Sequence, residues 1–207
     1  MYNKIIMGIY TIKPKFQKTL RPIENIFVRY HVHPTVVNLL GFLMACIGAL
    51  GILLSPKYPI LLFVTAFAVN ARTACNALDG LVARRLNVAS KFGEVLNELI
   101  DRFSDSVLFI SIYFLSSTSN TLALFTLVII LINSYLSILS KASGASRQYG
   151  GIVGKADRMI YMSIASVLVF FTHNQNIWNY FLWFILLTTV VTFFQRFATT
   201  RRELAES

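Results

Sequence analysis

The sequence predicts an all-α integral membrane protein, a single domain over residues 1–207 built around a bundle of six transmembrane helices. Its composition is 56% hydrophobic and 14% aromatic, and its mean hydropathy is +0.62, which is too apolar for a soluble domain of this length. Several apolar stretches approach the roughly 20 residues that a membrane-spanning helix needs. The alternating apolar and polar pattern of membrane strands is absent from the sequence.

The six-helix bundle is expected over residues 34–207, with spans near 35–55, 59–84, 92–116, 120–140, 157–173 and 177–199. Six spans place both termini on the same side of the membrane. Most of the nineteen Lys and Arg residues flank the spans on that side, whereas the opposite loops hold only Lys57. By the positive-inside rule, both termini and the charged loops are therefore predicted to be cytoplasmic.

Residues 1–33 are expected to form an interfacial segment at the membrane surface. They lack the long apolar core of a signal peptide, because basic residues interrupt the apolar ones. Pro14 and Pro22 disfavour one long helix, so the prediction is several short interfacial pieces, with a disordered basic tail as the alternative. The apolar residues of this segment are Ile5, Ile6, Ile9, Phe16, Leu20, Ile26 and Phe27, and its basic residues are Lys4, Lys13, Lys15, Lys18, Arg21 and Arg29.

The formal net charge of +10 is spread over several membrane-flanking segments, and no nucleic-acid-binding motif accompanies it. Anionic lipid headgroups or phosphorylated substrates are therefore the expected partners, and nucleic acid is not. Cys46 and Cys75 fall within predicted spans and indicate neither a disulfide nor a metal framework. The three histidines are separated from the acidic residues and receive no catalytic role.

Five of the nine acidic residues gather at the ends of the second and third predicted spans, where carboxylates are costly and usually functional. At about 100° per residue they fall, together with two asparagines and an arginine, on one stripe of each helix. We expect the two stripes to face each other. The residues are Arg72, Asn76 and Asp79 on one helix and Glu94, Asn97, Glu98, Asp101 and Asp105 on the other.

Such a set of hard oxygen ligands suits Mg²⁺, Mn²⁺ or Ca²⁺, and the absence of a His or Cys cluster argues against zinc. The alternative is a set of structural ion pairs between helices, in which Arg72, Arg84, Arg85 and Arg102 neutralise the acids.

The segment NALDGLVARRLNVASKFGEVLNELID resembles the signature of the CDP-alcohol phosphotransferases, D-x-x-D-G-x-x-A-R-x8-G-x-x-x-D-x-x-x-D. The matching residues are Asp79, Gly80, Ala83, Arg84, Gly93 and Asp101. The first and third motif aspartates are replaced by Asn76 and Asn97, so this is a divergent member of the pattern. The six-span topology extends the resemblance across the chain.

The resemblance implies an enzyme that moves a phosphatidyl group from a CDP-linked lipid such as CDP-diacylglycerol to a small alcohol, releasing CMP. It also implies a homodimer and a divalent-metal centre of Mg²⁺ or Mn²⁺. By position, Asp79, Asp101, Asn76 and Asn97 would hold metal, and Asp101 would be the general base. Because two charges are lost, Glu94, Glu98 or Asp105 are candidates for compensating ligands.

The remaining motif residues are assigned to binding of the CDP-linked donor. Gly80 and Gly93 lack a Cβ and would let the cytidine approach the helix backbones, although close helix packing is the alternative. Ala83 belongs to the same surface, and Arg84 would contact phosphate or brace the loop.

A glycine-rich basic segment, KASGASRQYGGIVGKADR, follows the fourth predicted span. Its cations are Lys141, Arg147, Lys155 and Arg158, which predict a pocket for a phosphorylated acceptor such as glycerol 3-phosphate or an inositol phosphate. A loop that only touches lipid headgroups is the alternative.

Two other functional classes stay open on the sequence alone. A non-catalytic relative would keep the fold as a lipid-binding or partner subunit after losing two metal ligands. A solute transporter that uses the buried acids is less favoured, because no inverted repeat is visible.

Overall fold

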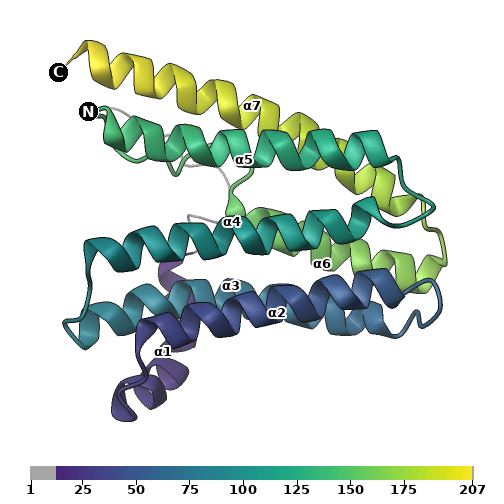
Figure 1. Cartoon of the computed structure of the whole chain (residues 1–207), viewed down its shortest axis with the longest axis horizontal. Coiled ribbons are helices and arrows are strands. Elements are labelled where there is room, and N and C mark those ends of the chain that lie inside the picture. Colours follow the sequence, from purple (N-terminus) through teal and green to yellow (C-terminus); the bar gives the residue numbers. More distant parts are fainter. Residues whose placement is uncertain (1–12, 207) are drawn as a thin grey trace.

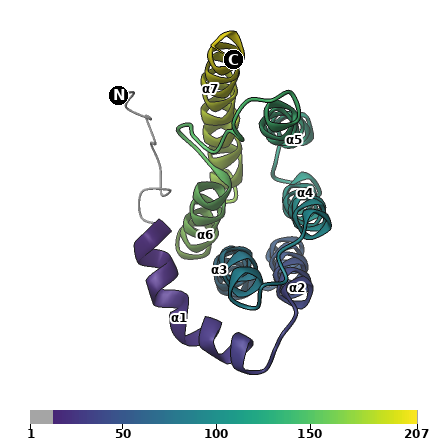
Figure 2. The ribbon, with the colours of Figure 1, turned by 90° about the vertical axis from the view of Figure 1, so that its left-hand side faces the viewer.

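The computed structural model describes residues 13–206, with side chains from residue 16 onward. This part of the chain forms seven α-helices and contains no strand (Figure 1). Helices α2 to α7 form a bundle, and α1 lies along its outside near one end, beside α3 (Figures 1 and 2). The bounds are α1 Lys13–Arg29, α2 Pro34–Leu54, α3 Leu61–Arg85, α4 Lys91–Tyr113, α5 Asn120–Ala142, α6 Lys155–Thr172 and α7 Ile177–Ala205.

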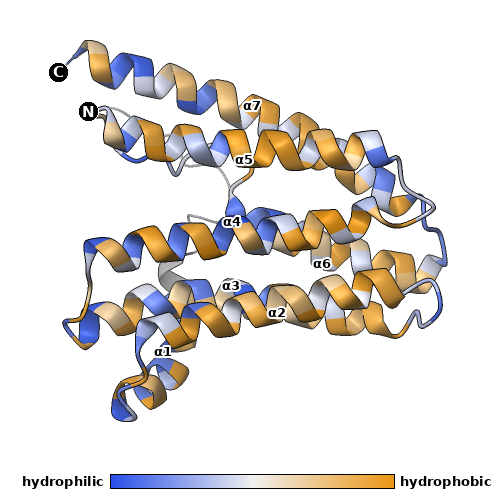
Figure 3. Cartoon of the chain, in the orientation of Figure 1, coloured by the Kyte–Doolittle hydropathy of each residue, from blue (hydrophilic) through white to orange (hydrophobic). Residues whose placement is uncertain are grey.

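Four of the helices, α2, α3, α5 and α7, are long and apolar enough to cross a membrane by length and composition. Helix α4 carries six charged residues, and α6 has 18 residues with three charges in its first turn. Figure 3 shows long hydrophobic stretches on α2 and α5, with hydrophilic residues near the α1 end of α3, α4 and α7. Residues 13–206 are therefore all-helical in their secondary structure and include several apolar helices, as an integral membrane protein requires.

Helices α2 and α3 pack closely because glycines on α2 leave room for the neighbouring backbone. A Cβ at Gly51 would lie 2.9 Å from the carbonyl oxygen of Leu61. The hydroxyl of Thr65 on α3 donates a hydrogen bond to the carbonyl of Gly48 at 3.0 Å. Such small-residue contacts are typical of helix pairs in lipid, where close approach maximises van der Waals contact.

The hydrophobic core runs through the bundle and contains Leu62, Leu108, Met159, Trp178 and Leu182, all fully buried. Helix α2 packs against both α3 and α4, and α6 packs against α3. Helices α3 and α4 have little direct backbone contact, so the space between them is bridged by side chains.

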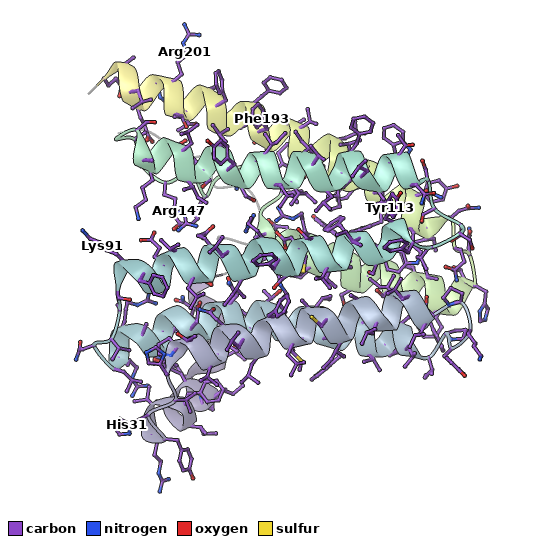
Figure 4. All side chains as sticks on the ribbon, in the orientation of Figure 1. His31, Lys91, Tyr113, Arg147, Phe193 and Arg201 are labelled. Atoms are coloured by element: carbon purple, nitrogen blue, oxygen red, sulfur yellow. The ribbon has the colours of Figure 1, made fainter. Side chains whose placement is uncertain are left out.

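The connection from α3 to α4 is a short turn over residues 86–90. Asn87 adopts a left-handed conformation with φ 57°, which asparagine tolerates better than most residues. Ser90 then caps α4 by accepting a hydrogen bond from the backbone N–H of Gly93 at 3.0 Å. Because the turn is short, the last turns of α3 and the first turns of α4 lie at the same end of the bundle. Lys91 and Arg147 mark that end, and Tyr113 marks the opposite one (Figure 4).

The prediction that Pro14 and Pro22 divide the amino-terminal segment was wrong for residues 13–29, which form one helix that contains Pro22. Pro14 lies in the first turn, where a missing N–H costs nothing. Leu20 is buried with Phe16 and Phe27 against residues of α2 and α3, and this packing offsets the one hydrogen bond that Pro22 removes. The expectation for residues 1–12 lies outside the described residues.

Candidate active site between α3 and α4

The two predicted polar stripes face each other in the structure. The amide nitrogen of Asn76 on α3 donates to Asn97 Oδ1 at 3.3 Å and to Asp101 Oδ1 at 2.9 Å, both on α4. One turn earlier on α3, Arg72 donates to the carbonyl oxygen of Asp101 at 3.2 Å. Three of the four motif positions for metal ligands therefore meet in one place.

The fourth position, Asp79, lies one turn after Asn76 on α3 and is 6% exposed. Its Oδ1 accepts a hydrogen bond from the backbone N–H of Gly80 at 2.5 Å, and the side chain of Asn38 on α2 hydrogen-bonds to it. These contacts fix the carboxylate near the end of α3.

Among residues 13–206, no three His, Cys, Asp or Glu side chains form a metal-binding group. The oxygen donors at the motif positions are instead two carboxylates and two carboxamides. Asp101 Oδ2 is buried and pairs with the ammonium of Lys155, so a metal ion at this oxygen would share the carboxylate with that ammonium or displace it. This mixed set of hard oxygens fits a divalent cation of the Mg²⁺ or Mn²⁺ type, with less negative charge than four aspartates would supply.

Asp101 is the residue at which α3, α4 and α6 meet. Its side chain is 4% exposed and forms an ion pair with the ammonium of Lys155, the first residue of α6. Arg72 lies 3.7 Å from its other oxygen. The two nearby cations lie beside the buried carboxylate as counter-charges.

Asp105, one turn further into the bundle, is fully buried and surrounded by arginines. It pairs with Arg72 at 2.9 Å, with Arg158 of α6 at 3.0 Å and with Arg102 at 3.6 Å. Both of its oxygens are engaged in these ion pairs. The predicted alternative of structural ion pairs between helices therefore describes Asp105, whereas Arg85 instead pairs with Glu24 of α1 at 3.4 Å.

Glu94 and Glu98, the other candidate compensating ligands, pair with cations at the end of α5 and in the loop that follows it. Glu94 pairs with Lys141 at 2.6 Å and with Arg147 at 3.2 Å, and Glu98 forms a close ion pair with Arg147. Burial by itself disfavours the charged guanidinium, but Glu98 and Glu94 outweigh it and hold the pKa of Arg147 above its ordinary value.

The predicted donor residues lie along the edge of this arrangement. Gly80 is partly buried near the end of α3, and a Cβ there would lie 3.4 Å from a guanidinium nitrogen of Arg84. Ala83 is partly buried on the same helix, and Arg84 is exposed. Gly93 occupies the first turn of α4 beside the capping Ser90.

All four predicted acceptor residues reach this end of the bundle, but they divide into two groups. Lys155 and Arg158 pair with Asp101 and Asp105, whereas Lys141 and Arg147 pair with Glu94 and Glu98. A narrow cleft beside the first group opens between α2, α3 and α4. It is lined by Asn38, Gly41, Arg72, Asn76, Ile100, Asp101 and Ser104.

Sequence reasoning missed two side chains of this region. Arg196 of α7 lies near Arg102, Arg147 and Arg158, and it donates to the carbonyl of Gly150 at 2.9 Å. Asn38 hydrogen-bonds to Asp79 from α2. No local sequence pattern assigns either residue to the site. Arg196 is one of several cations that flank the predicted spans, and Asn38 is an isolated polar residue in an apolar run.

Comparisons with known proteins agree with this geometry. The family model for CDP-alcohol phosphatidyltransferase matches residues 32–195. An inner membrane protein of Escherichia coli is 30% identical, with 86% of this chain and 89% of that protein aligned. A phosphatidylinositol phosphate synthase of Mycolicibacterium smegmatis is 31% identical over 90% of this chain and 85% of its own length.

Solved structures of the phosphatidylinositol phosphate synthase of Mycobacterium tuberculosis have the same fold. The one with CDP-DAG bound has a TM-score of 0.72 and 27% identity, covering 86% of this chain and 92% of that chain. Another, in complex with manganese and citrate, has the same TM-score and identity and covers 86% of this chain and 87% of that one. The chain belongs to the CDP-alcohol phosphatidyltransferase family, whose members are membrane transferases of phospholipid synthesis.

Proposed function

We propose that this protein transfers a phosphatidyl group from CDP-diacylglycerol to a phosphorylated alcohol of the inositol phosphate class, releasing CMP. The proposal rests on two contacts of Asp101, a hydrogen bond from Asn76 of α3 and an ion pair with Lys155 of α6. This contact joins the motif that the family uses for the CDP-linked donor to a basic segment suited to an anionic acceptor. The names of two relatives, both phosphatidylinositol phosphate synthases, support the acceptor class.

For the donor, we assign Asp79, Asp101, Asn76 and Asn97 to hold a divalent cation, Mg²⁺ or Mn²⁺. When bound, such a cation neutralises the diphosphate and stabilises the leaving phosphate of CMP. Gly80, Ala83 and Gly93 would lie along the cytidine, and Arg84 beside it at the exposed end of α3. We leave Glu94, Glu98 and Asp105 outside the ligand set, because they lie outside the motif positions and are paired with other cations of the protein. Asp101 also pairs with Lys155, but it occupies a motif position and contacts Asn76, so it stays in the set.

For the acceptor, we assign Lys155, Arg147 and Arg196 to bind the phosphate, with Arg158 and Lys141 as supporting charges. Lys155 lies beside the proposed base and Arg196 reaches the loop from α7. A phosphate held there would place a neighbouring hydroxyl of the acceptor near Asp101.

The reaction requires one proton transfer and no covalent intermediate. Asp101 removes the proton of the acceptor hydroxyl as that oxygen attacks the lipid-linked phosphorus. The bond between this phosphorus and the bridging oxygen breaks, and CMP leaves with the electron pair. Lys155 and Arg72 hold the Asp101 carboxylate in position before the transfer.

We further propose six membrane spans, α2 to α7, as one domain with α1 at the interface, and a cytoplasmic location for both termini and the site. Basic residues that flank the helices support this orientation, with Lys91, Arg147 and Arg201 all near the α1 end of the bundle (Figure 4). In this arrangement Asp101 and Asp105 of α4 face the bundle interior, where they pair with Lys155 and Arg158 of α6. The homodimer that the family resemblance implies remains a prediction, which crosslinking in membranes would test.

The direct test is CMP release from CDP-diacylglycerol by purified protein in Mn²⁺ or Mg²⁺, with inositol phosphate, glycerol 3-phosphate, free inositol and serine as separate acceptors. We expect release with a phosphorylated acceptor and loss of release in Asp101→Asn. Turnover with only the unphosphorylated alcohols would refute the acceptor class. No turnover with any acceptor, together with no binding of a cytidine nucleotide, would refute the enzyme assignment.

A further inference from the structure

A second polar cleft lies between α1 and α3, separate from the candidate active site. It has a volume of about 600 Å³, within the usual range for ligand-binding clefts. Its lining residues come from both helices and are Gln17, Lys18, Arg21, Glu24, Asn25, Leu81 and Arg85.

The cleft lies on the opposite side of α3 from the motif residues. At 100° per residue, Leu81 is rotated about 160° and Arg85 about 120° from the direction of Asp79. Figure 2 shows the same relation, with α1 and α4 on opposite sides of α3. A ligand in this cleft would therefore contact none of the residues that we assign to the reaction.

The charge of the cleft is strongly unbalanced. Lys18, Arg21 and Arg85 contribute three positive charges, and Glu24 contributes the one negative charge. Glu24 is 5% exposed and already pairs with Arg85 at 3.4 Å, while Asn25 accepts a hydrogen bond from Arg85 at 2.5 Å. These contacts fix Arg85 in place, whereas Lys18 and Arg21 are exposed at the cleft.

The surroundings of the cleft are those of a membrane surface. Leu20 of α1 is buried against α3, which anchors the helix, while Ile23 and Ile26 on α1 are exposed. A helix with basic residues around a cleft and exposed isoleucines beside it matches an interfacial helix, whose apolar side chains enter the lipid as its cations meet headgroups.

We propose that this cleft binds the phosphate of an anionic phospholipid headgroup, with Lys18 and Arg21 as the cations that recruit it and Arg85 as the fixed contact. Guanidinium and ammonium groups from two elements suit a phosphodiester, and Gln17 and Asn25 offer hydrogen bonds to a polar headgroup. Such a lipid would hold α1 against α3 at the end of the bundle that carries the active site.

The test is binding of short-chain phosphatidylglycerol to the full-length protein in neutral detergent, compared with short-chain phosphatidylcholine and with inorganic phosphate. The test variant is the double substitution Lys18→Gln and Arg21→Gln. The matched control is Arg29→Gln with Arg201→Gln, which removes the same charge from exposed positions outside the cleft. Thermal unfolding verifies that each variant is folded.

We expect saturable binding of phosphatidylglycerol, little binding of phosphatidylcholine, and an affinity that falls roughly tenfold or more in the test variant but less than about twofold in the control. An equal loss in both variants would overturn the proposal in favour of general surface charge. Inorganic phosphate that binds as tightly as the lipid, and is lost in the same variant, would overturn the lipid assignment. Because the readout is binding, its failure is independent of whether the protein catalyses transfer.

Discussion

Arg72 of α3 and Asp105 of α4 form an ion pair inside the bundle, with 2.9 Å between the guanidinium nitrogen and the carboxylate oxygen and both side chains almost completely buried. The same arginine donates to the backbone carbonyl of Asp101. The pair therefore fixes the separation of α3 and α4 near Asp101, the proposed base. The backbones of the two helices make little direct contact there, so side chains set their spacing.

Replacing Asp105 with Asn should strongly destabilise the protein. The substitution leaves Arg72 and Arg158 buried without their counter-charge, and breaking a buried ion pair in this way costs about 3–5 kcal/mol. We expect a clear fall in the temperature of unfolding in detergent. Glu94→Gln is the control, because the exposed pairs of Glu94 contribute about 1 kcal/mol or less. Equal stability of the two variants would contradict a structural role for Asp105.

Restoring aspartate at positions 76 and 97 together should make stability depend on metal. Asn76 donates to Asp101 at 2.9 Å, so a carboxylate at position 76 would repel Asp101 when no cation is bound. We expect a lower unfolding temperature in EDTA than for the unsubstituted protein, and a larger increase on addition of Mn²⁺.

The same double variant should bind Mn²⁺ roughly tenfold or more tightly in calorimetry, because two charges are added in a partly desolvated site. The control is Asn70→Asp, which adds a carboxylate to α3 at a position whose amide contacts Ser163 rather than the site. Unchanged Mn²⁺ affinity in the double variant would show that Asn76 and Asn97 do not face the cation.

Arg147→Gln should weaken the binding of the acceptor more than the binding of the donor. Its guanidinium is held by Glu98 and Glu94, which aim it into the region between the loop and α4. Loss of one charge-assisted hydrogen bond predicts a rise of roughly tenfold or more in the KM of a phosphorylated acceptor, with the KM of CDP-diacylglycerol changed little. Lys141→Gln, which removes a more exposed cation of the same network, should have a smaller effect. Equal increases in both KM values would indicate general electrostatics instead.

Glu203 of α7 should act as a positioning residue for the loop of residues 143–154. Its carboxylate accepts hydrogen bonds from the backbone and hydroxyl of Ser146 at 2.8 and 2.9 Å, and from Gln148 at 3.1 Å. Arg147 lies between these two residues. Glu203→Ala should therefore raise the acceptor KM with little change in kcat, and should increase hydrogen exchange in residues 143–154.

The neighbouring Glu206, exposed beyond the end of α7, provides the control for that experiment. Glu206→Ala should leave both the acceptor KM and the exchange rates unchanged. If Glu203→Ala changed kcat and the KM of both substrates equally, with no change in exchange, the positioning role would be wrong.

The sequence by itself determined helices α2 to α7 and the composition of the site, but not the single helix α1. Apolar runs of sufficient length specify α2, α3, α5 and α7, and the bounds of α4 and α6 follow from the polar connections that flank them, such as the turn capped by Ser90. The 100° rotation per residue placed Asn76 and Asp79 on one face of α3 and Asn97 and Asp101 on one face of α4. These features depend on residues within a few turns of one another, which a sequence displays directly.

Only the tertiary structure decided which charges pair. Lys155 meets Asp101, Arg158 meets Asp105 across 53 residues of sequence, and Arg147 meets Glu98 across 49 residues. Nothing local distinguishes these cations from Arg84, which stays exposed, or from Arg85, which binds α1. The packing of α6 on α3, and the contacts by which α7 holds the loop of residues 143–154, decide which cation reaches which carboxylate. Because desolvation makes an unpaired buried carboxylate costly, each one is stable only beside the cation that this packing brings to it.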